Sequence, residues 1–186
     1  MTACRPTLAL GAMAVWLFVA PAQAQHHGGH RHGHAAPATP YAGMQSRDIK
    51  ALSEAEQADL RAGRGMGLAL AAELNGYAWP MHALEHADAL GLDATQRARL
   101  IQLMDTMRAD AIAAGERLIA AERALDRLFA GGTASPEAVR AATAAVASAQ
   151  GEVRAVHLVT HIAAREVLTP AQRDRYAALR GYRTPG

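Results

Sequence analysis

Seam positions at steps of three and four residues run through two long stretches of the chain. In the first stretch these positions are Leu100, Met104, Met107, Ala111, Ala114, Leu118, Ala121, Leu125 and Leu128. In the second they are Val139, Ala142, Val146, Ala149, Val153, Val156, Thr160, Ala163 and Val167. Such spacing puts one mostly apolar seam along a helix, so it predicts two long helices, the first of about 37 residues.

The segments around these stretches carry turn and capping motifs. Residues 130–136, AGGTASP, form a short link in which Ser135 can cap a helix and Pro136 fits its first position. Two long helices with matched seams and a short link predict an antiparallel hairpin. The motifs LDATQ (residues 92–96) and LTPAQ (residues 168–172) are capping boxes that bracket this hairpin, and the second begins a last short helix.

The part of the chain before the hairpin predicts shorter helices. The pattern from Ser53 to Asn75 is helical and opens on a capping box, although Gly63, Gly65 and Gly67 interrupt it. We interpret these glycines as close-packing or kink positions, because a phosphate loop would follow a strand and end in GK[ST]. A short helix follows Pro80 and ends at Gly91.

No run alternates apolar and polar residues with a period of two, so the predicted fold class is all-α. We expect a long antiparallel helical hairpin with short flanking helices. The predicted organisation is a signal peptide (1–24), a disordered His-rich tail (25–40), an N-terminal helical segment (41–79) and a helical hairpin domain (80–183).

The first 24 residues have the composition of an export signal. Arg5 precedes an apolar run of about fifteen residues, and Ala22-Gln23-Ala24 is an A-x-A cleavage site. The run is shorter than the roughly twenty residues that span a bilayer. We therefore expect an exported soluble protein cleaved after Ala24 and resident in the periplasm, with a membrane-anchored form as the alternative.

Composition restricts the chemistry that the chain can perform. Cys4 is the only cysteine and lies in the predicted signal peptide, so disulfides, thiolate zinc sites and cysteine nucleophiles are excluded from the exported chain. Any metal site must use His, Asp, Glu or Met. The formal net charge is only +2, without the concentrated basic face that nucleic acid requires. We expect neither nucleic-acid binding nor an organic cofactor.

The tail between residues 25 and 40 is rich in histidine. Its five histidines are His26, His27, His30, His32 and His34. Neutral imidazole is a common ligand of Zn, Cu and Ni, and a flexible cluster can wrap such an ion with little geometric selectivity. The pattern therefore favours metal capture, and a spacer with incidental histidines is the alternative.

Two further histidine pairs fall within predicted helices. His82 and His86 lie four residues apart, as do His157 and His161, so each pair shares one face of a helix. A hairpin that turns near residue 133 places His161 opposite about residue 105, within reach of Asp105. We predict a folded metal site from these five residues, which would bind Zn, Ni, Co or Cu. Ordinary partly buried histidines are the alternative.

Two neighbouring features carry less weight. Glu85 is adjacent to His86, so HALEH does not match the H-E-x-x-H spacing of metallopeptidases, and we expect no enzymatic activity. Met104 and Met107 could ligate Cu(I), but both fall on the hairpin seam, which favours core packing.

From Pro80 to Tyr182 the chain resembles the bacterial periplasmic helical proteins of the Spy/CpxP superfamily, which includes heavy-metal sensors. The resemblance depends on the export signal, the hairpin and the motifs LDATQ and LTPAQ. It implies an embracing homodimer and no catalytic activity. His-rich termini like this tail occur in a zinc-binding branch of the superfamily.

The cobalt- and nickel-sensing branch has two histidines on its first helix, which His82 and His86 match. Its acidic ligand falls on Met104 by our count, with Asp105 adjacent. Its histidine on the return helix falls on Thr160, and its methionine on Ala164, so the second half of that site departs from the branch pattern.

Two functions follow from these observations. The first is a periplasmic heavy-metal sensor or buffer that acts on a membrane-bound regulator. The second is an ATP-independent refolding chaperone or envelope-stress adaptor for unfolded periplasmic clients, for which an Arg-rich helix surface would serve. A structural helical module without a ligand is a third possibility. The arginines of that surface are Arg97, Arg99, Arg108, Arg117, Arg123 and Arg127.

Overall fold

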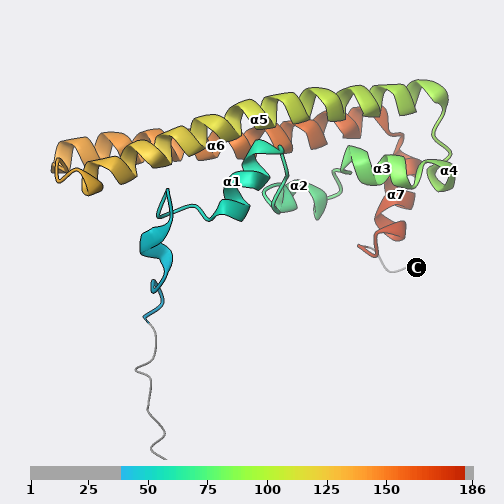
Figure 1. Cartoon of the computed structure of the whole chain (residues 1–186). Coiled ribbons are helices and arrows are strands. Elements are labelled where there is room, and N and C mark those ends of the chain that lie inside the picture. The colour runs from blue at the N-terminus through green and yellow to red at the C-terminus, as the bar shows by residue number, and fades with distance from the viewer. Residues whose placement is uncertain (1–38, 183–186) are drawn as a thin grey trace, which may run out of the picture. The chain divides into compact units, whose positions relative to one another are not determined.

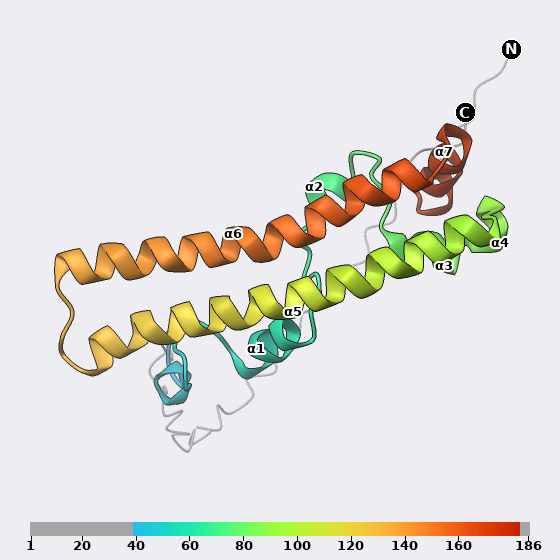
Figure 2. The same cartoon turned by 90° about the horizontal axis from the view of Figure 1, so that it is seen from above.

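The computed structural model describes residues 39–182, and the regular structure in that part of the chain is helical. Its only strand-like pairing there is a single bridge between Ile49 and Leu52. Two long helices, α5 (Ala94–Ala130) and α6 (Pro136–Val167), run antiparallel and side by side (Figure 1 and Figure 2). The predicted all-α fold and helical hairpin are confirmed.

The predicted caps fix the ends of the hairpin. The Asp93 side chain accepts a hydrogen bond from the backbone N–H of Gln96 and starts α5, which has the expected 37 residues. Ser135 caps α6, with Pro136 at the first helical position. Thr169 caps the last helix, α7 (Pro170–Leu179), through a complete capping box. Each cap satisfies backbone N–H groups that have no partner within the helix.

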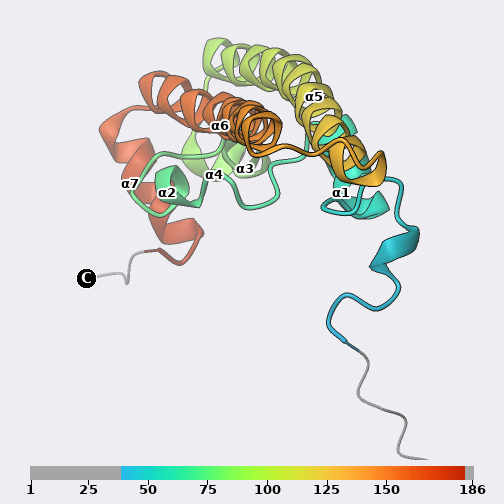
Figure 3. The same cartoon turned by 90° about the vertical axis from the view of Figure 1, so that its left-hand side faces the viewer.

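Short helices cover one side of the hairpin (Figure 1 and Figure 3). They are α1 (Glu54–Arg61), α2 (Leu70–Glu73), α3 (Pro80–Glu85) and α4 (Ala87–Leu90). The 3-10 helix η1 (Met44–Ser46), which has no buried residue, precedes them. α1 and α3 pack on α5, α2 packs on α6, and α4 packs on α7. Within residues 39–79, α1 and α2 therefore pack on the hairpin.

α1 approaches α5 closely because α5 has a glycine at the contact. A Cβ at Gly115 would lie 2.6 Å from the carbonyl oxygen of Leu60, which is closer than real Cβ atoms come. Only the absence of a side chain lets the end of α1 rest on α5 at this point.

The helical pattern predicted from Ser53 to Asn75 is divided in the structure. The capping box of Ser53 and Glu56 is present, but α1 ends at Arg61 and α2 begins at Leu70. Gly63 and Gly67 adopt φ values of +66° and +76°, which are incompatible with a right-handed helix. The glycines thus produce a loop of residues 62–69 in place of one kinked helix.

Two hydrophobic clusters form the core. The first joins α3, α4 and α7 to the open end of the hairpin and contains Ala78, Ala83, Ala87, Leu90, Leu92, Leu100, Ala164, Leu168 and Tyr176. The second joins α1 to the middle of the hairpin and contains Ile49, Leu60, Ala114, Leu118, Ile119, Ala149 and Val153. Along both long helices a stretch that contains Met107 and His157 separates the two clusters. No helix between residues 39 and 182 has the length and apolar character needed to cross a membrane.

Candidate metal centre

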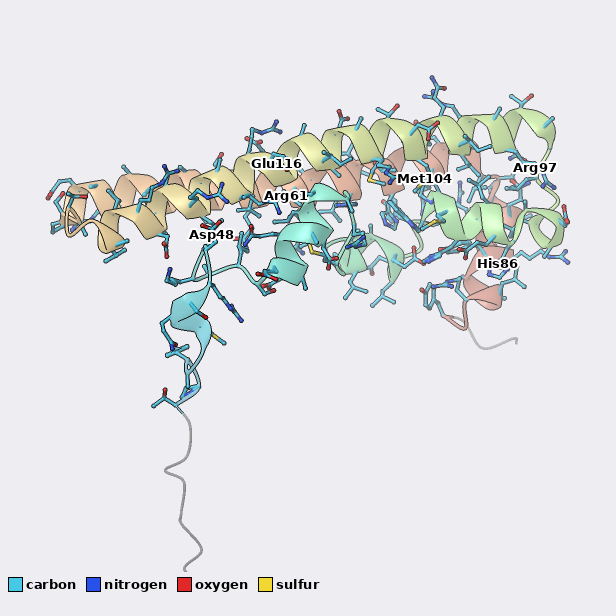
Figure 4. All side chains as sticks on the ribbon, in the orientation of Figure 1. Asp48, Arg61, His86, Arg97, Met104 and Glu116 are labelled. Atoms are coloured by element: carbon cyan, nitrogen blue, oxygen red, sulfur yellow. The ribbon has the colours of Figure 1, made fainter. Side chains whose placement is uncertain are left out.

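A pocket of about 460 Å³ lies between the two hydrophobic clusters. Its walls come from the loop 62–69, from α2, from the start of α3 and from one face each of α5 and α6. Figure 4 shows Met104 on the side of α5 that faces the short helices. Three histidines line the pocket, namely His82, His157 and His161. Two histidine pairs that are distant in sequence therefore contribute to one cavity.

Glu73, the last residue of α2, lies between two of these histidines. Its side chain is 9% exposed. Oε1 lies 3.5 Å from Nδ1 of His82, and Oε2 lies 3.7 Å from Nδ1 of His161. His82 belongs to α3 and His161 to α6, so a single carboxylate links the two predicted pairs.

Two phenols and a guanidinium hold the other side of this carboxylate. Oε1 accepts hydrogen bonds from the hydroxyl groups of Tyr176 (2.5 Å) and Tyr182 (3.0 Å). The Tyr176 oxygen also accepts one from the backbone N–H of Trp79 (3.2 Å). Burial and the bond to Glu73 raise the pKa of Tyr176, so this phenol remains a protonated donor. Nε of Arg180 lies 3.8 Å from Oε1. The carboxylate thus ties α2 to the C-terminal segment.

His161 is held in one orientation by a carbonyl and an indole. Its Nδ1 lies 2.7 Å from the carbonyl oxygen of Tyr77. Because a carbonyl only accepts, Nδ1 carries the hydrogen and the lone pair of the neutral ring is on Nε2. The ring stacks on Trp79 with centroids 5.0 Å apart. Burial lowers the pKa of His161, an effect that the Tyr77 carbonyl and Glu73 oppose. The neutral form, which can bind a metal, is therefore favoured.

His157 has no hydrogen-bond partner for its buried Nε2. The residue is 1% exposed, and its ring centroid lies 6.1 Å from that of Trp79. Burial lowers the pKa of His157, and the neighbouring His161 lowers it further. A neutral imidazole with an unshared electron pair therefore borders the pocket.

The chemistry of these groups fits a transition-metal ion. Oε2 of Glu73 is also buried without a hydrogen-bond partner. A buried polar atom left unpaired costs about 1–3 kcal/mol, and a bound cation would remove that cost at both atoms. Imidazole and carboxylate are ligands of Zn, Co and Ni. Within residues 39–182, however, no three His, Cys, Asp or Glu side chains converge on one coordination centre, so the side chains must move to hold an ion.

The structure separates the predicted site residues into two groups. His82, His157 and His161 line the pocket, whereas His86 and Asp105 do not. His86 lies at the junction of α3 and α4, where its φ of −100° interrupts the helix, and Figure 4 places it on the side of α3 away from Met104. Asp105 is exposed on α5. The five tail histidines lie outside the described residues.

Glu73 is the residue that our sequence analysis did not identify. It is the only Asp, Glu, Lys or Arg between residues 65 and 84, in the otherwise apolar and glycine-containing run LALAAELNGYAWP. A single acidic residue in such a run is a pattern that could have indicated a buried carboxylate.

Three of the six arginines of the arginine-rich surface have acidic partners. Arg97 pairs with Asp88 at 2.7 Å, and Arg117 pairs with Glu152 at 2.8 Å. Arg123 lies 2.8 Å from Asp48. Figure 4 labels Arg97 and Asp48, together with the further pair of Arg61 and Glu116. These contacts are those of a solvated helix face that pairs with its own acidic residues.

Comparison with known families gives one match. A family model described as heavy-metal resistance matches residues 65–175. The match starts before Pro80 and so includes Glu73 as well as the whole hairpin. No curated protein and no solved structure matches the chain.

Proposed function

The chain belongs to the heavy-metal resistance family, and from that premise we propose that it is a metal-binding stress protein, a sensor or buffer of Zn, Ni, Co or Cu ions. The observation that supports this proposal is the position of Glu73 between His82 and His161. A carboxylate and two imidazoles from three helices form a donor set that an ion can draw together.

Each proposed ligand has an identifiable donor atom. Glu73 offers Oε2, which has no other partner, and His161 offers Nε2, since its Nδ1 donates to Tyr77. His82 completes the set, with His157 within the same pocket. His86 and Asp105, which do not line the pocket, are left out of this donor set. The tail histidines would capture the ion and deliver it.

Binding at Glu73 would be communicated to α7. This carboxylate is the acceptor for Tyr176 and Tyr182, so a change in its position alters the contacts of the C-terminal segment. A ligand that binds one arrangement better than the other shifts the population between them. The packing of α7 is therefore the element through which a partner would sense the ion.

We further propose that the protein acts in the periplasm, after cleavage following Ala24, as a homodimer that contacts a membrane-bound regulator. Support for the dimer comes from apolar side chains that the hairpin leaves in solvent, namely those of Ile101, Val159 and Ile162. Equilibrium sedimentation tests the dimer, and a mass set by one chain at all concentrations would contradict it.

The chaperone alternative has less support from the structure. A client-binding face would need free basic groups, but Arg97, Arg117 and Arg123 are engaged with acidic partners. Suppression of the aggregation of an unfolded client in the presence of a chelator would favour this alternative.

Calorimetric titration of Zn(II), Ni(II), Co(II) and Cu(II) tests the proposed function. The chain should carry serine at the five tail histidines, so that only the folded site is measured. We expect one site per chain, with affinity lost in Glu73→Gln and His82→Ala and retained in Asp105→Asn. Affinity should fall as the pH drops toward about 6, because imidazole must be neutral to bind. Equal affinity in Glu73→Gln and the parent would refute the site.

A further inference from the structure

Methionines are concentrated around the pocket to an extent that the hydrophobic seam does not explain. The chain has seven methionines, and four of them line this one cavity: Met66, Met81, Met104 and Met107. Of the others, Met1 and Met13 lie in the predicted signal peptide, which leaves Met44 outside the pocket. The four come from three separate segments, namely the loop 62–69, α3 and α5.

Core packing accounts for only part of this set. Met107 is 4% exposed and belongs to the hairpin seam. Met66 and Met81 are 42% and 46% exposed, so their side chains are not held there by burial alone. Exposed methionines at the wall of an apolar pocket leave their thioether sulfurs accessible to a ligand.

The backbone of Met66 is in a conformation that is unfavourable for its residue type. Its φ is +43°, and it is the only non-glycine residue of the described chain with a positive φ. Left-handed backbone costs a residue with a long side chain of order 1–3 kcal/mol and is concentrated at functional sites. The neighbouring Gly65 lies against His157, since a Cβ there would meet Nδ1 of that ring at 3.7 Å. The loop thus holds Met66 beside the imidazole whose Nε2 has no partner.

We propose that this pocket binds a soft monovalent cation, Cu(I) or Ag(I), through Nε2 of His157 and thioether sulfurs of Met66, Met81, Met104 and Met107. The inference rests on the proposed metal-binding function and deepens it, because it names the class of metal. It assigns the cation to the methionine side of the cavity, away from the Glu73 carboxylate.

The donor chemistry selects this class of ion. Thioethers are soft, uncharged ligands that favour Cu(I) over Zn(II), Co(II) and Ni(II). An uncharged donor set in an apolar cavity also suits one positive charge better than two, because the desolvation cost grows with charge. The indole of Trp79 also lines the pocket. Arg64 and Arg108 also line the pocket but are exposed, so solvent screens their charges.

The arrangement of the His, Cys, Asp and Glu side chains is consistent with this assignment. No three His, Cys, Asp or Glu side chains in residues 39–182 converge on one centre. Nε2 of His157 therefore needs donors of another kind, and four methionines line the same pocket.

Ag(I), which is stable in air, is the probe for the test. The full chain with serine at the five tail histidines would be labelled with carbon-13 at the methionine methyl groups. We expect one equivalent of Ag(I) to shift the methyl signals of Met104 and Met107 and to leave that of Met44 unchanged. The fluorescence of Trp79, the only tryptophan outside the predicted signal peptide, should change at the same stoichiometry.

Four variants make the test specific. Met104→Leu and Met107→Leu conserve volume and should fold, yet each should weaken Ag(I) binding about tenfold or more, while Met44→Leu should match the parent. Glu73→Gln should keep Ag(I) binding and lose divalent ions. Equal Ag(I) affinity in the parent and both α5 variants would overturn the inference. Ag(I) binding lost only in Glu73→Gln would also overturn it and leave the proposed function intact.

Two remaining outcomes separate this inference from the proposed function. Ag(I) binding with the expected methionine shifts, in a chain that binds no divalent ion, would sustain the inference and remove Glu73 as a metal ligand. If an apolar organic molecule shifts the methionine methyl signals and Ag(I) does not, the inference is overturned in favour of an apolar ligand.

Discussion

Substitution of Gly115 by alanine changes the free energy of unfolding through two effects of opposite sign. Alanine is about 1 kcal/mol more favourable than glycine in a helix interior. At Gly115, however, the added methyl group would lie 2.6 Å from the carbonyl oxygen of Leu60 and 3.0 Å from its carbonyl carbon. These are backbone atoms that cannot rotate away, and overpacking of this kind costs about 1–3 kcal/mol. The difference between these two terms predicts that Gly115→Ala lowers the free energy of unfolding by up to about 2 kcal/mol.

Gly151 provides the matched control. It lies inside α6, and a Cβ there would meet nothing within 4 Å. Gly151→Ala should therefore raise the free energy of unfolding by about 0.5–1 kcal/mol.

Urea denaturation at equal protein concentration, followed by circular dichroism, measures both changes. If Gly115→Ala stabilises the chain as much as Gly151→Ala does, α1 does not rest on α5 as described. The loop 62–69 that follows α1 would then not be held against the pocket.

Three further predictions concern the Glu73 region, the buried imidazoles and the caps. Tyr176→Phe removes a donor to the buried carboxylate of Glu73 and the acceptor for the backbone N–H of Trp79, so it should lower the free energy of unfolding by about 2–4 kcal/mol. Tyr182 is more exposed, so Tyr182→Phe should lower it by less than about 1 kcal/mol. Equal losses in thermal or urea unfolding would contradict this. Burial lowers the pKa of His157 and His161 below 6.5, so on acidification the unfolded chain takes up protons at a higher pH than the folded chain does. With a chelator present, the urea midpoint should therefore be constant above about pH 6.5 and should decrease as the pH is lowered below that value. A midpoint that rises on acidification would be inconsistent with neutral buried rings. Asp93→Ala should cost about 1 kcal/mol through loss of the cap of α5, and an unchanged midpoint would show that this cap is dispensable.

The features that could be predicted from sequence are those encoded within a few residues of the chain. The seam of α5 and α6 repeats every three or four residues, and each capping box spans four residues. Such patterns report directly on local backbone conformation. Helix starts at Ala94, Pro136 and Pro170 were accordingly predictable to the residue.

The composition of the site was only partly predictable because it depends on rotation about helix axes. The register of the hairpin predicted which turn of α5 lies opposite His161. It did not predict which residues of that turn face α6. Asp105 lies at the predicted height along α5, but its side chain is exposed to solvent. The interruption at His86 similarly separates two residues that an ideal helix would place on one face.

The contacts of Glu73 were beyond prediction for a different reason. Its partners lie between 9 and 109 residues away along the chain and come from α3, α6 and the C-terminal segment. No local pattern encodes contacts of that range. They depend on the break between α1 and α2, which the glycines of the loop 62–69 create.

The burial of the hairpin seam is uneven along its length. None of residues 120–148 is fully buried, whereas Leu100, Met107, Ala114 and Leu118 are. Free energies of local opening follow the amount of buried apolar contact. Amide hydrogen exchange should therefore be graded along both long helices, fast at the turn and slow beside the pocket. The turns of α5 and α6 next to the link between them would open and close many times while the rest of the helical domain stays folded. A partner that binds these turns could order them without disturbing the histidines of the pocket.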